Sequence, residues 1–282
     1  MPEIELSCGT ISYTDTAGPG PVLVFTHGVL MDGSVWAQVV GALRDVHRCI
    51  SPTLPLGAHP YAMRADADLS LHGQAMILAQ FIERLDLRDA TLIANDWGGP
   101  ILTAVERPER LARLVLTPCE AFDNIPPGLP GAFASLSTAL PGGVLLAAQL
   151  LRWRAMRRLP FTFGWMSKRP VPVAIFDAWL RSSLSDAGVR RDLRKYVRTR
   201  GAAAQLKKAT LSLRHFRGPA LVAWSVEDRI MPPRHGRMLA ELLPKGRLVE
   251  FEDAFTLLPL DQPMRLAQAI DQFIRDSANR AS

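Results

Sequence analysis

Short apolar runs recur along the chain and predict a series of buried strands. Pro21 to Thr26 (PVLVFT) and Ala90 to Asn95 (ATLIAN) are rich in Val, Leu, Ile and Thr. Comparable runs follow at Ala112 to Thr117, Ala220 to Ser225 and Arg247 to Glu252. Most of these runs lack polar alternation, which is typical of parallel strands covered on both faces.

Segments with helical periodicity separate these runs. Trp36 to Leu43 and Gly98 to Glu106 are short helical segments, and Leu71 to Leu87 repeats apolar residues at helical spacing. Ser51 to Pro60 is rich in Pro, Gly and His, so we expect a loop there. The alternation of apolar and polar residues over residues 1–14 predicts a pair of strands. The order of elements predicts an α/β fold with a mostly parallel central sheet and flanking helices.

This alternation stops between residues 122 and 216, where the sequence is helical and proline-rich. We therefore predict a core domain formed by residues 1–120 and 217–282, with a helical cap domain of residues 121–216 inserted into it. Residues 125–151 contain no charged side chain, which is long enough for a membrane-spanning helix. Several prolines and the Gly142-Gly143 pair interrupt that stretch, so we expect no transmembrane segment. Contact with a membrane surface stays open.

Composition and charge narrow the class of protein. Hydrophobic residues make up 48% of the chain and charged residues 21%, as in an ordinary globular enzyme. The net charge of +6 is uneven, because residues 121–213 hold 15 Lys or Arg against 4 Asp or Glu. No aromatic interleaving or nucleic-acid motif accompanies this basic segment, so we expect a solvated helical face and no nucleic-acid partner. The three cysteines lack disulfide or zinc spacing, and no signal peptide is evident, which predicts a cytoplasmic location.

One strand end carries the main chemical motif. The run from Ala90 leads directly into Asn95-Asp96-Trp97-Gly98-Gly99. A nucleophile at a tight strand-to-helix turn needs small residues two positions away on each side, and Ala94 and Gly98 meet that need. The N-terminus of the following helix favours negative charge, so we expect the Asp96 carboxylate to be ionised. The alternative is that Asp96 only caps the helix.

The motif Asn95-Asp96-Trp97-Gly98-Gly99 resembles the nucleophile turn of the haloalkane dehalogenases and related epoxide hydrolases, a group within the α/β-hydrolase superfamily with an Asp nucleophile. The resemblance extends over nearly the whole chain, because the order and spacing of other landmarks also fit. It implies an α/β-hydrolase fold and an enzyme acting on a small hydrophobic substrate, haloalkane-like or epoxide-like, through an alkyl-enzyme ester. This chemistry needs no cofactor, and the sequence has no phosphate-binding glycine loop or metal-binding cluster.

The resemblance also assigns supporting residues. In the turn His27-Gly28-Val29, the backbone N–H of Val29 is expected to stabilise negative charge together with that of Trp97. His27 and Gly28 are expected to shape the turn. The acid of the catalytic triad would be Asp228, in the loop after a late strand, or Glu120, after the strand that ends at Thr117. We favour Asp228 and keep Glu120 as the alternative.

The chain departs from the family at the catalytic histidine. Thr256 stands where the family places that residue, and no histidine follows His235. His235 is expected at the exposed start of a helix and is a weak substitute. A threonine hydroxyl cannot take a proton from water near neutral pH, whereas histidine can. The second half of the family's reaction, hydrolysis of the ester, is therefore in question.

Two further departures concern the leaving group. Haloalkane dehalogenases hold the halide with the indole N–H of the residue after the nucleophile, here Trp97, and a second donor that Val29 cannot supply. A cap tryptophan, Trp153, Trp165 or Trp179, could replace it. Epoxide hydrolases use cap tyrosines as proton donors, and Tyr196 is the one cap candidate, set in a basic run that gives no sign of its placement.

Three functional hypotheses follow. The first is a hydrolase in which Asp96 is the nucleophile and Asp228 or Glu120 activates water without a histidine. The second is a non-hydrolytic enzyme, such as a lyase, decarboxylase or cyclase, with Asp96 as a base in a dry pocket. The third is a catalytically inactive homologue that binds a hydrophobic or anionic ligand. The sequence gives neither the substrate nor the oligomeric state.

Overall fold

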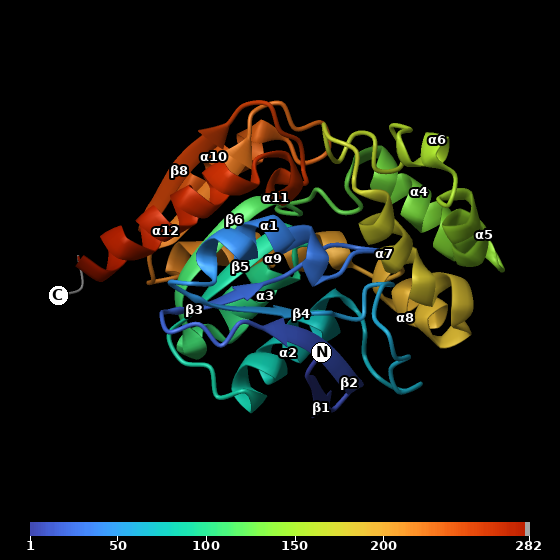
Figure 1. Cartoon of the computed structure of the whole chain (residues 1–282), viewed down its shortest axis with the longest axis horizontal. Helices are drawn as coiled ribbons and strands as arrows, with labels where there is room; N and C mark the ends of the chain where they lie inside the picture. Colours follow the sequence, from blue (N-terminus) through green and yellow to red (C-terminus); the bar gives the residue numbers. More distant parts are fainter. Residues whose placement is uncertain (280–282) are drawn as a thin grey trace.

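A single eight-stranded sheet organises the computed structural model, which describes residues 1–279 (Figure 1). The strand order is β1-β2-β4-β3-β5-β6-β7-β8. The pairs β1/β2 and β2/β4 are antiparallel, and every other neighbouring pair is parallel. The strands are β1 (Glu3–Leu6), β2 (Gly9–Asp15), β3 (Val22–Phe25), β4 (Arg48–Pro52), β5 (Ala90–Asp96), β6 (Leu111–Cys119), β7 (Ala220–Ser225) and β8 (Gly246–Phe251).

Helices cover both faces of this sheet, as predicted. The helix α1 (Ala37–Leu43), preceded by the 3-10 turn η1 (Gly33–Trp36), packs against α12 (Pro263–Asn279) on one face (Figure 1). On the other face α2 (Leu71–Arg84) packs against α3 (Gly99–Glu106). The remaining elements of this part are η2 (Pro108–Arg110), α10 (Pro233–Leu242) and α11 (Leu258–Asp261).

Between β6 and β7 the structure contains helices and turns but no strand within the described residues, in agreement with the sequence pattern. These helices gather beyond one end of the sheet, at the right of Figure 1, except α9, which packs on α3. They are α4 (Gly128–Ala139), α5 (Gly143–Leu150), α6 (Arg154–Arg157), α7 (Val173–Ser185), α8 (Ala187–Val197), α9 (Ala202–Ser212) and η3 (Leu213–His215).

One strand was missed in the sequence. We expected a loop from Ser51, but Ser51 and Pro52 complete β4, which pairs with β2 on one side and β3 on the other. Only Cys49 and Ile50 are apolar in this strand, so it lacks an apolar run that could be recognised. Its backbone is buried because two neighbouring strands enclose it, a constraint that acts only in the folded sheet.

The helices of the described chain are too short or too polar to span a membrane. Within residues 1–279, none is both long enough and apolar enough to cross a bilayer. The uncharged stretch of residues 125–151 instead forms two short helices, α4 and α5, separated by a turn at Leu140 to Gly142.

Candidate functional site

Asp96 lies at the end of β5, at the tight turn into α3. Its φ of 61° places it in the left-handed region, which is strained for a residue with a side chain. Gly28 makes room for it, because a Cβ on Gly28 would lie 1.8 Å from Asp96 Oδ2. The sharp turn and the close approach present the Asp96 carboxyl above the edge of the sheet, as expected for a nucleophile turn.

The surroundings of Asp96 are dry. The side chain is almost fully buried, and the backbone N–H of Val29 donates a hydrogen bond to it. Burial raises the pKa of Asp96 to about 7, against the lowering effect of the Val29 hydrogen bond. We expected the helix N-terminus to keep this group ionised, but in a buried pocket desolvation is the larger effect. Trp97 donates its backbone N–H to the carbonyl of Asn95 at 2.7 Å.

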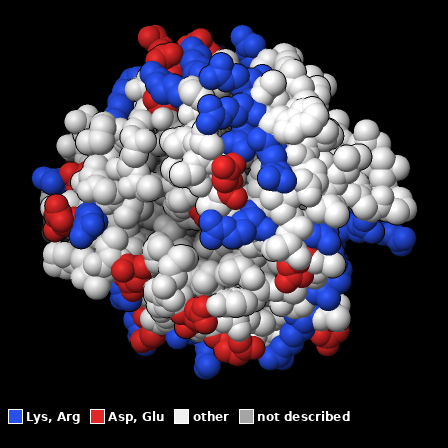
Figure 2. All heavy atoms as spheres, turned by 45° about the vertical axis from the view of Figure 1, so that its right-hand side comes forward, with Lys and Arg blue, Asp and Glu red and all other residues white. Residues whose placement is uncertain are grey.

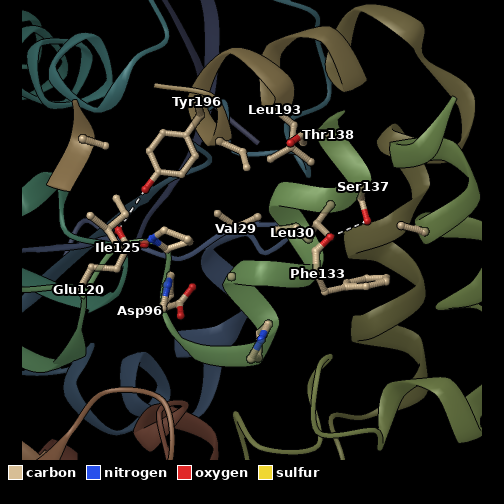
Figure 3. Close-up of a pocket in the computed structure, with 18 of the residues that line it drawn as sticks. Val29, Leu30, Asp96, Glu120, Ile125, Phe133, Ser137, Thr138, Leu193 and Tyr196 are labelled. Atoms are coloured by element: carbon tan, nitrogen blue, oxygen red, sulfur yellow. Dashed lines mark hydrogen bonds between the residues drawn. The ribbon is translucent and has the colours of Figure 1, made fainter. Parts of the chain in front are cut away.

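Glu120 follows β6 and enters the same pocket. Its Oε2 accepts hydrogen bonds from the Gly98 backbone N–H at 3.2 Å and from the Tyr196 hydroxyl at 3.1 Å (Figure 3). Burial and the nearby charge of Asp96 raise the pKa of Glu120 to about 8. The pocket therefore holds two carboxyl groups that disfavour simultaneous ionisation.

Tyr196 comes from α8 and was the site residue whose position the sequence left unknown. Figure 3 shows its ring reaching from the helix toward Glu120, on the same pocket as Asp96. Asp192, one turn earlier, fixes the helix on the core, because it accepts the Met63 backbone N–H at 2.6 Å and lies 3.3 Å from His59 Nε2. The buried Val189, Leu193 and Tyr196 are spaced four and three apart, a helical stripe that could have indicated the inward position.

Asp228 and Thr256 meet each other outside the pocket lining. Thr256 Oγ1 donates to Asp228 Oδ1 at 3.0 Å, and the backbone N–H groups of Ile230 and Met231 donate to the same oxygen at 2.8 Å. Asp228 Oδ2 is buried and has no hydrogen-bond partner in the structure. Burial raises the pKa of Asp228 to about 7, although these hydrogen bonds lower it. Asn95 Nδ2 donates to the Thr256 carbonyl at 2.8 Å, which ties this loop to the strand of Asp96.

His27 and His235, the two histidines considered in the sequence, do not line the pocket that contains Asp96. The backbone N–H of Leu54 donates to His27 Nε2 at 2.9 Å, so His27 Nδ1 carries the proton and bonds the Gly28 carbonyl. His27 thus holds the turn. His235 begins α10 as predicted, but it is buried rather than exposed, with its ring 5.1 Å from that of Phe122. The Gly236 next to it packs on Trp224, which draws this helix start inward.

The pocket itself is apolar and has a volume of about 300 Å³. Asp96, Glu120 and Tyr196 are the ionisable groups that line it, and none of its lining residues within the described chain is a histidine or a tryptophan. The walls come from the β3 turn, the loop before α4, and helices α4, α5, α8 and α9. A cavity of this size and polarity suits a small hydrophobic molecule.

The donors for a halide are incomplete. Trp97 Nε1 is buried without an aligned hydrogen bond, although it lies close enough to Tyr196 to affect the pKa of that hydroxyl. Trp179 Nε1 is engaged by Asp32 and by Ser34, at 3.1 and 2.8 Å. Trp153 is largely exposed and Trp165 stacks with Arg229. None of these three tryptophans lines the pocket, and Trp97 does not line it either.

Comparison with known proteins agrees with this geometry. The family model described as alpha/beta hydrolase fold matches residues 21–263. The chain therefore belongs to the α/β-hydrolase fold family. Within that family it is similar to the haloalkane dehalogenases: haloalkane dehalogenase 2 of Mycobacterium bovis is 26% identical over 272 residues, covering 94% of this chain and 92% of that enzyme.

Two other relatives are a further haloalkane dehalogenase and a decarboxylase. A haloalkane dehalogenase of Mesorhizobium japonicum is 30% identical over 114 residues, which span only 40% of this chain and 36% of that enzyme. The cis-3-alkyl-4-alkyloxetan-2-one decarboxylase of Shewanella oneidensis is 26% identical over 283 residues, covering 94% of this chain and 85% of that enzyme. Among solved structures, an ancestral haloalkane dehalogenase superposes with a TM-score of 0.78 at 20% identity, covering 99% of this chain and 100% of that one, which shows a shared fold.

Proposed function

We propose that the chain is an enzyme in which Asp96 attacks a saturated carbon of a small hydrophobic substrate and forms an alkyl ester. The observation that carries this proposal is a carboxyl group held at a strained strand-to-helix turn, at the floor of an apolar pocket. A carboxylate in dry surroundings is a stronger nucleophile than one in water, because it loses its hydration shell. The whole-length similarity to haloalkane dehalogenase 2 supports the same first step.

The residues of the pocket suit an oxygen leaving group better than a halide leaving group. Tyr196 and Glu120 form a hydrogen-bonded pair beside Asp96, and the negative charge of an ionised Asp96 raises the pKa of Glu120 and so favours its protonated form. With Glu120 protonated, its O–H donates to Tyr196, and the Tyr196 O–H is released to donate to an oxygen of the substrate. A halide would find no indole donor, because neither Trp97 nor any of Trp153, Trp165 and Trp179 lines the pocket.

The fate of the ester depends on the Thr256 loop. Thr256 Oγ1 donates to Asp228, and a neutral hydroxyl cannot activate water near pH 7. Hydrolysis would therefore need Asp228 or Glu120 as the base. We expect this step to be slow, so that the alkyl ester on Asp96 accumulates.

A second candidate function avoids hydrolysis, and the whole-length similarity to an oxetanone decarboxylase favours it. In an oxetan-2-one, Asp96 would attack the saturated ring carbon that is bonded to the ring oxygen. The bond between that carbon and the ring oxygen would break and give a free carboxylate. Loss of CO₂ from that carboxylate leaves an electron pair that forms the alkene and expels the Asp96 carboxylate. This sequence returns the enzyme to its starting state without water, so the missing histidine would be no defect.

Intact mass measurement after incubation with haloalkanes, epoxides and dialkyl oxetanones tests both proposals. A mass increase that is absent in Asp96→Asn establishes the nucleophile, and a stable increase identifies the slow hydrolysis. Alkene and CO₂ released without incorporation of labelled water establish the second function. Neither adduct nor product with any of these substrates would reject both and leave the inactive binding homologue.

A further inference from the structure

The outer surface of α4 and α5 is apolar. Leu136 is 61% exposed on α4 and Leu146 is 59% exposed on α5, two helices that pack against each other. Trp153, directly after α5, is 68% exposed, and Leu129 and Leu140 are also exposed. We call these five residues the α4–α5 face. Contiguous exposed leucines and a tryptophan are unusual on a solvated surface and mark a site of association.

The same two helices line the substrate pocket with their inner residues. Phe133 and Thr138 of α4, and Val144 and Ala147 of α5, face the cavity that contains Asp96. A helix is about 10 Å thick, so an apolar layer of that depth separates the pocket from the α4–α5 face. These helices are therefore apolar on both sides. The pocket explains the apolar residues on the inner side but not those on the exposed side.

The charges near this face are mainly positive, and Asp177 of α7, the nearest acidic residue after it in the sequence, is ion-paired with Arg157. From residue 124 to residue 176 the chain contains no acidic residue. Arg152, Arg154 and Arg158 are exposed at the edge of the face, and none of them forms an ion pair within the described chain. Arg194 of α8 donates to the Leu140 carbonyl at 3.2 Å, which brings another guanidinium to the α4–α5 turn. Figure 2 shows basic side chains, with acidic ones among them, beside broad uncharged surface.

We propose that the α4–α5 face docks on an anionic lipid bilayer. Leucine and tryptophan side chains enter the boundary between headgroups and acyl chains, and arginines at the edge contact lipid phosphates. Tryptophan favours this boundary because its ring is apolar and its N–H is polar. The docked protein would present the apolar helices that line its pocket to the membrane, the phase in which a hydrophobic substrate dissolves.

A second copy of the chain fits this face less well. In a two-fold symmetric dimer the same surface meets itself, so Arg152, Arg154 and Arg158 would approach their own equivalents. Like charges brought together in this way oppose association. A bilayer containing phosphatidylglycerol supplies both the apolar phase and the negative charge.

Flotation with lipid vesicles tests this proposal independently of any enzymatic activity. We expect the protein to float with vesicles of equal parts phosphatidylcholine and phosphatidylglycerol, and to bind phosphatidylcholine vesicles much more weakly. The double variant Leu136→Asp and Leu146→Asp should abolish flotation. Met264→Asp on α12 is the matched control, because Met264 is 57% exposed and does not belong to the α4–α5 face, and it should float like the wild type.

A second pair of variants tests how much the arginines contribute to vesicle binding. The triple variant Arg152→Gln, Arg154→Gln and Arg158→Gln should weaken binding to anionic vesicles roughly 100-fold, since each basic residue contributes about fivefold near such a surface. A control that removes three positive charges elsewhere should change binding by less than a few fold. Suitable exposed positions are Arg84, Arg234 and Lys245.

Three results would overturn the proposal. The wild-type protein could fail to float with either kind of vesicle, or the Leu136→Asp and Leu146→Asp protein could float as well as the wild type. The third is light scattering that shows a dimer without lipid, abolished by the same double variant, together with no vesicle binding, which would assign the face to a second copy.

Discussion

Glu120 and Asp228 occupy equivalent places in the sequence, each just after a buried strand, and yet their surroundings differ. Glu120 faces Asp96 in the pocket and bonds the hydroxyl of Tyr196. Asp228 lies behind the pocket lining, where its Oδ1 accepts two backbone N–H groups and the hydroxyl of Thr256. One carboxyl is thus placed to exchange protons with a substrate, whereas the other holds a loop. Asp228 does not line the pocket and its partner Thr256 does not either, whereas Glu120 lines it directly.

The substitution Thr256→His, which places a histidine beside Asp228, has the largest expected effect on the difference between Asp228 and Glu120. In Thr256→His the new imidazole would meet Asp228, which already bonds the residue at this position. We expect hydrolysis of the alkyl ester on Asp96 to accelerate about 10²- to 10⁴-fold, the usual contribution of a general base. The lifetime of the adduct in intact mass spectra measures it.

Second substitutions on that background decide which carboxyl assists. If Asp228 orients the new histidine, Asp228→Asn removes most of the gain and Glu120→Gln leaves it. The reverse result would show that Glu120 is the acid of the restored triad. Circular dichroism controls for folding, because Thr256 is fully buried and histidine is larger.

The pH dependence of stability is the next largest effect. Burial raises the pKa values of Asp96 and Asp228 to about 7 and that of Glu120 to about 8, so these three groups bind more protons in the folded chain than in the unfolded chain above about pH 4. Their contribution to the free energy of unfolding is therefore highest at low pH in this window and falls as the pH rises toward 8, whereas the lowered pKa values of His27 and His235 act in the opposite direction below about pH 6.5. We expect Glu120→Gln to reduce this fall by about 2–4 kcal/mol, since each pKa unit corresponds to about 1.4 kcal/mol.

Urea denaturation at pH 5 and pH 8.5 measures this change. The matched variant Glu109→Gln alters an exposed carboxyl and should keep the slope of the wild type. A Glu120→Gln protein as pH-dependent as the wild type would show that Glu120 titrates normally.

Tyr196→Phe separates the two kinds of leaving group. The substitution removes the hydroxyl that bonds Glu120 and keeps the ring. We expect adduct formation with an epoxide to slow about 10- to 100-fold, at the low end of general acid catalysis, and that with a haloalkane to change little. Equal slowing with both substrates would assign Tyr196 to packing of the pocket instead of proton donation.

Thr256→Val has the smallest expected effect and tests the structural role of Asp228. It removes one hydrogen bond to Asp228 and keeps the shape of the side chain. We expect the free energy of unfolding at pH 5 to fall by about 1–2 kcal/mol, as when a buried hydrogen bond is lost. Adduct formation on Asp96 should stay unchanged, and slower formation would place Thr256 in the chemistry.

The sequence by itself determined the class of fold and the turn that carries Asp96. Apolar runs such as Ala90 to Asn95 depend on local composition, and the small residues around Asp96 are required by a local strain that is visible as its φ of 61°. The sequence pattern did not predict β4, because this segment becomes a strand only by pairing with β2 and β3.

Only the tertiary structure decided the ionisation state and the hydrogen-bond partners of the site residues. The helix N-terminus predicted an ionised Asp96, whereas burial of the carboxyl in the packed structure raises the pKa of Asp96 to about 7. Tyr196 reaches Glu120 because Asp192 anchors α8 to a loop that lies more than a hundred residues earlier in the chain. Desolvation and contacts between distant segments depend on packing in three dimensions, and no local pattern of residues contains them.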